Sequence, residues 1–145
     1  MIKLRSLLAP LALAFALSVG CGPGAVRTSA HALEIAGLAT ATAGDAISLA
    51  SEADARATCP REVADPDACL AVVSDRWAPV DLAFSGARVA LGAWYASTVA
   101  ASRSEAGAGL VEAALSFARA FAASYADLRA VAAGLGLALP DLPLP

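Results

Sequence analysis

The strongest constraint on the fold is a repeat of apolar and small side chains that runs through residues 70–98 without a slip. Its members alternate at spacings of three and four, at Leu70, Val73, Trp77, Val80, Phe84, Ala87, Leu91, Trp94 and Thr98. This spacing puts them on one narrow stripe of an α-helix, as in a coiled coil. Pro79 lies one step off the stripe, so we expect a kink between Asp75 and Pro79. Two shorter helices that meet at Ala78 are the alternative.

A second repeat of the same kind follows an interruption rich in Ser, Ala and Gly at residues 102–109. Its members alternate at spacings of four and three, at Leu110, Ala114, Phe117, Phe121, Ser124, Leu128, Val131 and Leu135. Two such helices joined by a short turn predict an antiparallel pair. Gly134 and Gly136 end the second of them, and Pro140 prevents its continuation. Residues 140–145 are expected to form an extended, Pro-rich tail.

An earlier segment predicts a third helix, with Thr28 or Ser29 as its N-cap. Its stripe consists mainly of alanine, at Ala32, Ile35, Ala39, Ala43, Ala46, Ala50, Ala53 and Ala57. The chain is 59% hydrophobic, with alanine prominent, and a face of methyl groups lets a partner helix approach closely. Residues 28–139 are therefore expected to form one all-α, antiparallel three-helix bundle with coiled-coil-like seams.

The connection between the first two helices, CPREVADPDAC, is bracketed by Cys59 and Cys69. Asp65 suits the N-cap of the next helix and Pro66 its first position. In an oxidising compartment the two cysteines would form a disulfide at the junction of the antiparallel helices. Two thiols without a nearby histidine do not complete a zinc site, so no metal is expected there.

The N-terminus has the organisation of a secretory signal peptide. Lys3 and Arg5 precede an apolar run from Leu7 to Val19, which is about the length of a signal-peptide core. An uncleaved membrane anchor is the alternative. The run ends in Ser18-Val19-Gly20-Cys21, which resembles the lipobox of bacterial lipoproteins, although Ser18 stands where a leucine is usual.

The lipobox resemblance implies cleavage before Cys21 and acylation of its thiol. Residues 1–20 would then be the signal peptide, and residues 21–27 a lipidated flexible tether. The lipid would anchor the protein in the cell envelope. Gly22 after the cysteine implies the periplasmic side of the outer membrane if the organism is Gram-negative. An ordinary secreted protein without lipid is the alternative.

Charge and composition exclude several classes of function. A chain that begins at Cys21 carries eight arginines, no lysine and thirteen acidic residues, hence a net charge of −5. Because nucleic-acid binding requires positive charge to neutralise phosphates, nucleic acid is not expected as a partner. His31 is the only histidine, and nothing around it suggests a catalytic group. We therefore expect a non-enzymatic protein without cofactors.

The remaining hypothesis is a protein that works by contact. Most aromatic side chains are expected to fill the core, whereas Tyr95 and Tyr125 flank their seams and are expected to reach the surface as contacts for a partner. The preferred function is a structural or protein-interaction module bound to another envelope protein. A small envelope inhibitor or superinfection-exclusion factor carried by a phage or mobile element is the alternative. The sequence leaves open whether the protein is a monomer or a homodimer.

Overall fold

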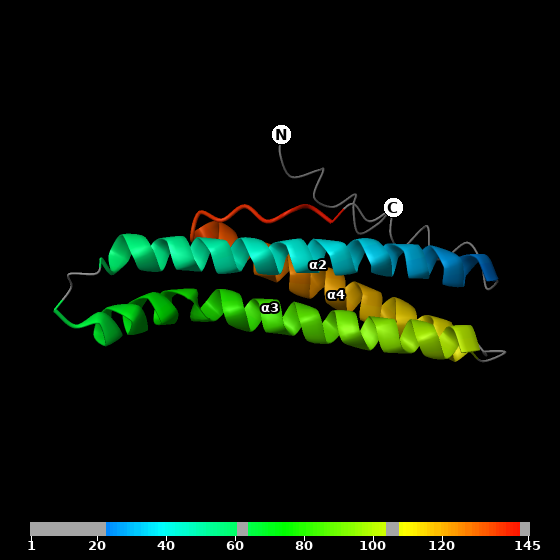
Figure 1. The fold of residues 1–145 in the computed structure, drawn as a ribbon. Coiled ribbons are helices and arrows are strands. Elements are labelled where there is room, and N and C mark those ends of the chain that lie inside the picture. The colour runs from blue at the N-terminus through cyan, green and yellow to red at the C-terminus, as the bar shows by residue number, and fades with distance from the viewer. Residues whose placement is uncertain (1–22, 61–63, 104–107, 143–145) are drawn as a thin grey trace, which may run out of the picture.

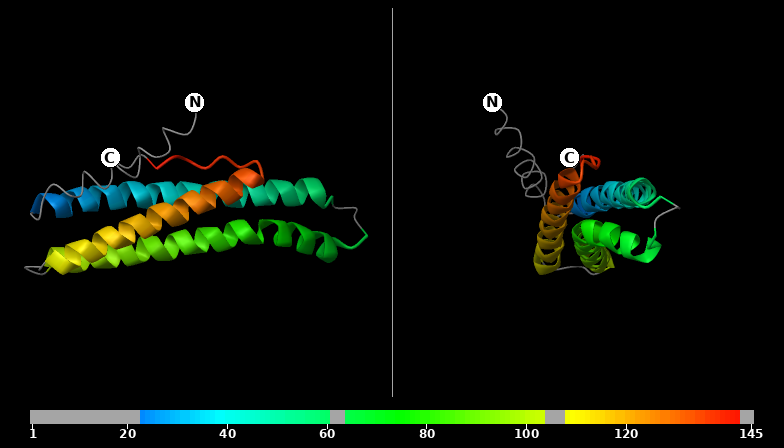
Figure 2. Two further views of the ribbon diagram at one scale, coloured as in Figure 1. Left: turned by 180° about the vertical axis from the view of Figure 1, so that it is seen from behind. Right: turned by 90° about the vertical axis from the view of Figure 1, so that its left-hand side faces the viewer.

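Three long helices run alternately up and down in the computed structural model, which describes residues 23–60, 64–103 and 108–142 (Figure 1). They are α2 (Pro23–Thr58), α3 (Pro66–Arg103) and α4 (Ala108–Gly134). Figure 2 shows that α4 begins beside α3 and crosses obliquely toward α2. The predicted all-α, antiparallel three-helix bundle is confirmed.

Helix α2 begins earlier than expected. Its first residue is Pro23 rather than Thr28 or Ser29, so residues 23–27, predicted as part of a tether, are helical. Proline is tolerated in the first turn of a helix because its missing N–H has no helical partner there. The buried face is made of small residues, namely Ser29, Ala32, Ala36, Ala39, Thr40 and Ala43, together with Ile47. Ala53 and Ala57, predicted on this face, are exposed.

Helix α3 is continuous through Pro79, and Figure 2 shows a bend in its first half. The single helix is therefore confirmed over the alternative of two. Every predicted seam position is buried or half-buried except Leu70, which is exposed. The start of the helix also follows the prediction. The backbone N–H of Ala68 donates to the Asp65 carboxylate at 3.0 Å, which is the hydrogen bond of an N-cap, and Pro66 is the first helical residue.

Helix α4 buries a stripe that shares three positions with the predicted one, Ala114, Phe121 and Leu128, and differs from it at the others. The buried positions are Ala114, Ala118, Phe121, Tyr125, Leu128 and Ala132. Of the predicted stripe, Leu110, Phe117 and Leu135 are exposed. Phe121 lies at the centre of the core, with its ring centroid 5.8 Å from that of Trp94 and 5.8 Å from that of Tyr125.

The chain reverses direction sharply after α4. Gly136 has a φ of 79°, which glycine adopts without steric cost, and its N–H donates to the carbonyl of Ala133. The N–H of Leu137 donates to the carbonyl of Ala132 at 3.0 Å, which completes a Schellman motif. The predicted helix end at Gly134 and Gly136 is thus confirmed.

The segment that follows, residues 137–142, includes the described part of the predicted tail, residues 140–142, and packs on the bundle. It runs back along α2 (Figures 1 and 2). Leu139 is buried, and Leu137 and Leu142 pack against the core. Asp141 forms an ion pair with Arg129 of α4. The C-terminal segment therefore contributes to the core rather than hanging free.

Candidate functional site

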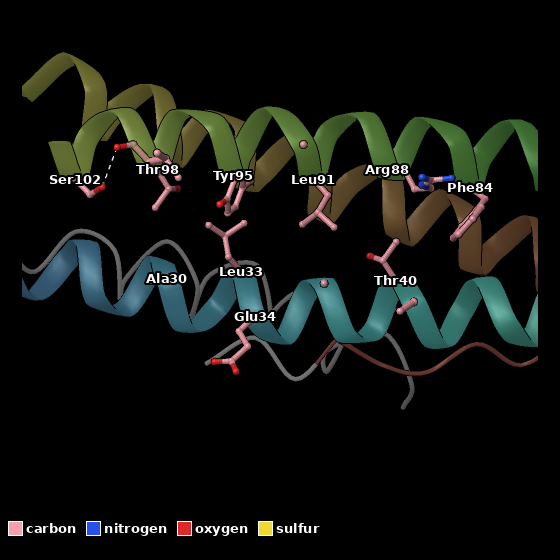
Figure 3. A pocket seen from close by; sticks show the side chains of 14 residues that line it. Ala30, Leu33, Glu34, Thr40, Phe84, Arg88, Leu91, Tyr95, Thr98 and Ser102 are labelled. Carbon is pink, nitrogen blue, oxygen red and sulfur yellow. Dashed lines mark hydrogen bonds between the residues drawn. The ribbon is translucent and has the colours of Figure 1, made fainter. Parts of the chain in front are cut away.

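A groove with a volume of about 820 Å³ lies between α2 and α3. This volume lies within the range of small-molecule sites, about 300–1,000 Å³. Side chains from both helices line it, as Figure 3 shows: Ala30, Leu33, Glu34, Gly37, Thr40 and Ala41 from α2, and Phe84, Arg88, Leu91, Gly92, Tyr95, Thr98, Val99 and Ser102 from α3. We call it the α2–α3 groove.

The groove is lined mainly by hydrocarbon. Leu33 points from α2 toward Tyr95 of α3, and Leu91 projects from α3 toward α2 (Figure 3). Gly37 and Gly92 widen it, because a Cβ atom added at either glycine would meet nothing within 4 Å. A hydrophobic surface of this kind, open to solvent, is typical of a binding site.

Phe84 closes one end of the groove. A Cβ atom at Gly44 would lie 2.8 Å from the Cζ atom of the Phe84 ring, so the glycine makes room for this ring between the two helices. The guanidinium of Arg88 lies over the same ring, 5.9 Å from its centroid, a cation–π arrangement. One positive charge thus marks the closed end.

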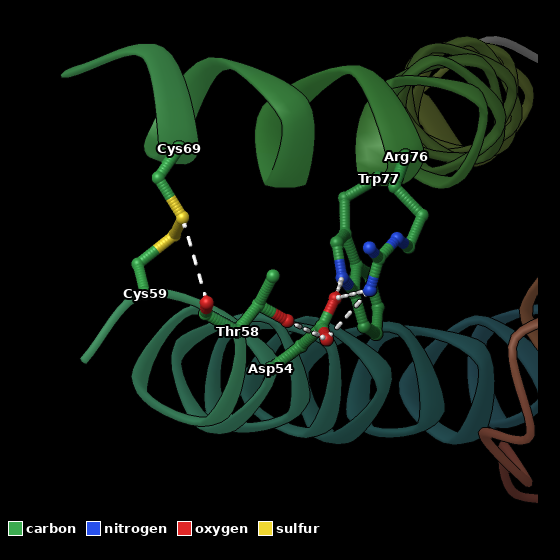
Figure 4. A network of polar contacts seen from close by, with 6 residues as sticks. All are labelled: Asp54, Thr58, Cys59, Cys69, Arg76 and Trp77. Carbon is green, nitrogen blue, oxygen red and sulfur yellow. Dashed lines mark hydrogen bonds and ion pairs between the residues drawn. A yellow bond between two sulfur atoms is a disulfide. The ribbon is translucent and has the colours of Figure 1, made fainter. Parts of the chain in front are cut away.

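A polar cluster joins α2 and α3 near the connection between them (Figure 4). Asp54 of α2 accepts hydrogen bonds from the Trp77 indole Nε1–H at 2.9 Å and from Arg76 Nη1 at 2.8 and 2.9 Å. The Thr58 hydroxyl, one turn later on α2, donates to the same carboxylate at 3.1 Å. The cluster fixes the axial register of the two helices, because the indole of the buried Trp77 needs this acceptor.

These donors lower the pKa of Asp54 below its ordinary value of 3.8. The main cause is the hydrogen bond from Trp77; burial opposes the shift, and Thr58 and Arg76 add to it. A carboxylate whose pKa is lower in the folded state stabilises the fold above its unfolded pKa. That stabilisation is lost as the pH falls through the folded value.

We therefore expect the free energy of unfolding to fall as the pH drops below about 4. In an Asp54→Asn variant this decline should be shallower, because one shifted carboxyl is gone. Glu52→Gln is the control, since among the described residues Glu52 pairs with Arg56 of its own helix alone and both side chains are exposed. Urea denaturation at a series of pH values measures the slopes. Parallel slopes in Asp54→Asn and the wild type would contradict the assignment.

The predicted disulfide is present: Cys59 and Cys69 are joined, with their Cα atoms 5.8 Å apart (Figure 4). Cys21, the predicted site of lipidation, and the predicted signal peptide, residues 1–20, lie outside the described residues. No group of three potential metal ligands occurs in the described residues. His31 is a surface residue, with its Nδ1 atom 3.7 Å from the carboxylate of Glu34.

The two tyrosines predicted at the surface have different positions. Tyr95 is 62% exposed and lines the α2–α3 groove, so its surface position is confirmed. Tyr125 is 1% exposed, so the prediction of a surface contact is wrong. Its hydroxyl donates to the carbonyl of Pro140 at 3.2 Å and lies 3.5 Å from the carbonyl of Ala39. Burial raises the pKa of this phenol.

Sequence reasoning missed the α2–α3 groove itself. The available indication was the set of glycines on facing helices, Gly37 and Gly92, which the helical repeat treats only as weak helix formers. None of the helices in the described ranges is long and apolar enough to cross a membrane. The chain matches no protein-family model, no curated protein and no solved structure.

Proposed function

We propose that this protein is a lipid-anchored, non-enzymatic helical bundle of the bacterial cell envelope that works by binding another envelope protein. The disulfide supports the location, because stable disulfides belong to oxidising compartments. It also uses two of the three cysteines of the chain and leaves Cys21, the lipobox-like position, as the third.

The proposed anchor is close to the bundle. Cys21 stands two residues before Pro23, the first residue of α2. Two or three acyl chains on Cys21 would hold the protein durably, since each buried methylene contributes about 0.8 kcal/mol. The bundle would then be held within reach of the membrane surface, with α2 starting almost at the lipid.

The observation that carries the contact function is an uncharged outer strip on α3. Leu82 and Val89 are seven residues apart on one face of the helix, and they are 76% and 71% exposed. The strip is continued by small exposed residues, at Ala78, Ser85, Ala96 and Ala100. Arg88 is the one charged residue between Leu82 and Ser102 in the sequence. Exposed apolar surface of this kind is typical of protein interfaces.

The anchor is tested by growing cells with an alkyne analogue of palmitate and isolating the protein. The wild-type chain should carry the label and a Cys21→Ala variant should not. A Cys59→Ala/Cys69→Ala variant, which keeps Cys21, is the matched control and should be labelled. An unlabelled wild-type chain would overturn the anchor and favour a secreted protein without lipid; equal labelling of Cys21→Ala would overturn Cys21 as its site.

The contact function is tested by cross-linking and affinity capture of the tagged protein from envelope extracts. A Leu82→Glu variant should lose the partner, because a charge then lies in the middle of the apolar strip. Leu49→Glu is the control, since Leu49 is 69% exposed but lies on α2. If Leu82→Glu captures the same proteins as the wild type, the strip is not the contact surface.

A further inference from the structure

We propose that the α2–α3 groove binds a free single-chain lipid with an acidic headgroup, such as a fatty acid. Its acyl chain lies along the groove and its headgroup pairs with Arg88. This ligand goes beyond the protein contact proposed above and uses a different surface, because Leu82 and Val89 are not among the residues that line the groove.

The dimensions of the groove suit one acyl chain. Along α2 its lining extends from Ala30 to Ala41, which is about 16 Å at the helical rise of about 1.5 Å per residue. Along α3 it extends from Phe84 to Ser102, about 27 Å by the same rise. One leaflet of a bilayer core, which a single chain fills, is about 15 Å thick. The groove is therefore long enough to cover such a chain.

Three of the four hydroxyl groups in the groove lining are already hydrogen-bonded inside the protein. Thr40 donates to the carbonyl of Ala36 at 2.7 Å, and Ser102 donates to that of Val99 at 2.8 Å. The hydroxyl of Thr98 is 3.3 Å from that of Ser29, within hydrogen-bond distance. Because these groups bond inside the protein, hydrocarbon can cover them without breaking a hydrogen bond. The fourth hydroxyl, on Tyr95, belongs to an exposed side chain. Apart from Arg88 and Glu34, the rest of the lining is methyl and methylene groups, the Phe84 ring and glycine backbone.

The charge at the closed end fits an acidic headgroup. Among the described residues Arg88 has no carboxylate partner within ion-pair distance, and its guanidinium rests on the Phe84 ring. A guanidinium binds carboxylate or phosphate oxygens in a fork. The one acidic side chain of the lining, Glu34, points away from α3 (Figure 3). An anionic headgroup at Arg88 would therefore pair with the guanidinium and would not be repelled by the Glu34 carboxylate.

The experiment titrates the purified full chain with cis-parinaric acid, a fluorescent fatty acid, and displaces it with palmitate or with uncharged hexadecanol. We expect saturable binding and displacement by both. Gly92→Leu places a side chain in the groove and should weaken the binding of both competitors at least tenfold. Gly86→Leu is the matched control: Gly86 is also an open glycine of α3 but does not line the groove, so binding should be unchanged.

The Arg88→Ala variant distinguishes the contribution of the headgroup to binding from that of the acyl chain. The variant should bind palmitate about fivefold more weakly, which is the upper range for an exposed ion pair, and should bind hexadecanol as tightly as the wild type does. A Cys21→Ala chain should bind like the wild type, because the ligand is a free lipid. Thermal melting followed by circular dichroism checks that each variant is folded. Three results would overturn the proposal: no saturable binding, equal binding by Gly92→Leu and Gly86→Leu, or loss of binding in Cys21→Ala.

Discussion

Replacing Phe121 by alanine is expected to lower the free energy of unfolding by about 3–5 kcal/mol, the usual cost of removing a buried phenylalanine. Phe121 is fully buried, and its ring contacts those of Trp94 and Tyr125, each at a centroid distance of 5.8 Å. Alanine would leave a cavity between α3 and α4 and would remove both aromatic contacts. Urea denaturation followed by tryptophan fluorescence measures the loss.

Phe117→Ala is the matched control, one turn earlier on the same helix. The repeat in the sequence places Phe117 and Phe121 on one seam, whereas the structure leaves Phe117 40% exposed. Its replacement should cost only about 1 kcal/mol, as is common for partly exposed positions. Equal losses in the two variants would mean that α4 buries the stripe predicted from the sequence, and the register described here would be wrong.

The register of α4 shows the limit of pattern reasoning. Both stripes alternate at spacings of three and four, and at two of the places where they differ the predicted one holds the larger side chain, Phe117 or Val131. The observed stripe instead includes Ala118 and Ala132, whose methyl groups let neighbouring segments pack close to α4. It also buries Tyr125, whose hydroxyl finds acceptors on α2 and on the C-terminal segment. Those acceptors are distant in the sequence, so no local repeat could indicate them.

Features that depend on neighbouring residues were predictable. The N-cap at Asp65, the helix end at Gly136 and the turn that brings Cys59 to Cys69 each follow from chemistry within one short segment. The α2–α3 groove depends instead on the separation between the two helices, and on Phe84 inserting beside Gly44. Helical periodicity gives the face of each helix but not the separation of two axes. The candidate site therefore required the structure.

Removing the disulfide with the double variant Cys59→Ser/Cys69→Ser is expected to lower the free energy of unfolding by about 2–3 kcal/mol. The bridge closes a sequence separation of 10 residues and so restricts the unfolded chain. It also lies beside the Asp54 cluster, so it holds together the end of the bundle where α2 and α3 are aligned (Figure 4). In thermal melting monitored by circular dichroism, the midpoint should fall by about 10 °C.

Chemical reduction supplies the matched comparison. Dithiothreitol should lower the melting midpoint of the wild-type chain by nearly the same amount, because it opens the same bond. It should leave the double variant unchanged, since Cys21 is the one cysteine that remains there. A wild-type midpoint that does not respond to reduction would contradict a stabilising disulfide between Cys59 and Cys69. It would also remove the argument that two of the three cysteines are already used, on which the assignment of Cys21 as the lipid attachment site partly depends.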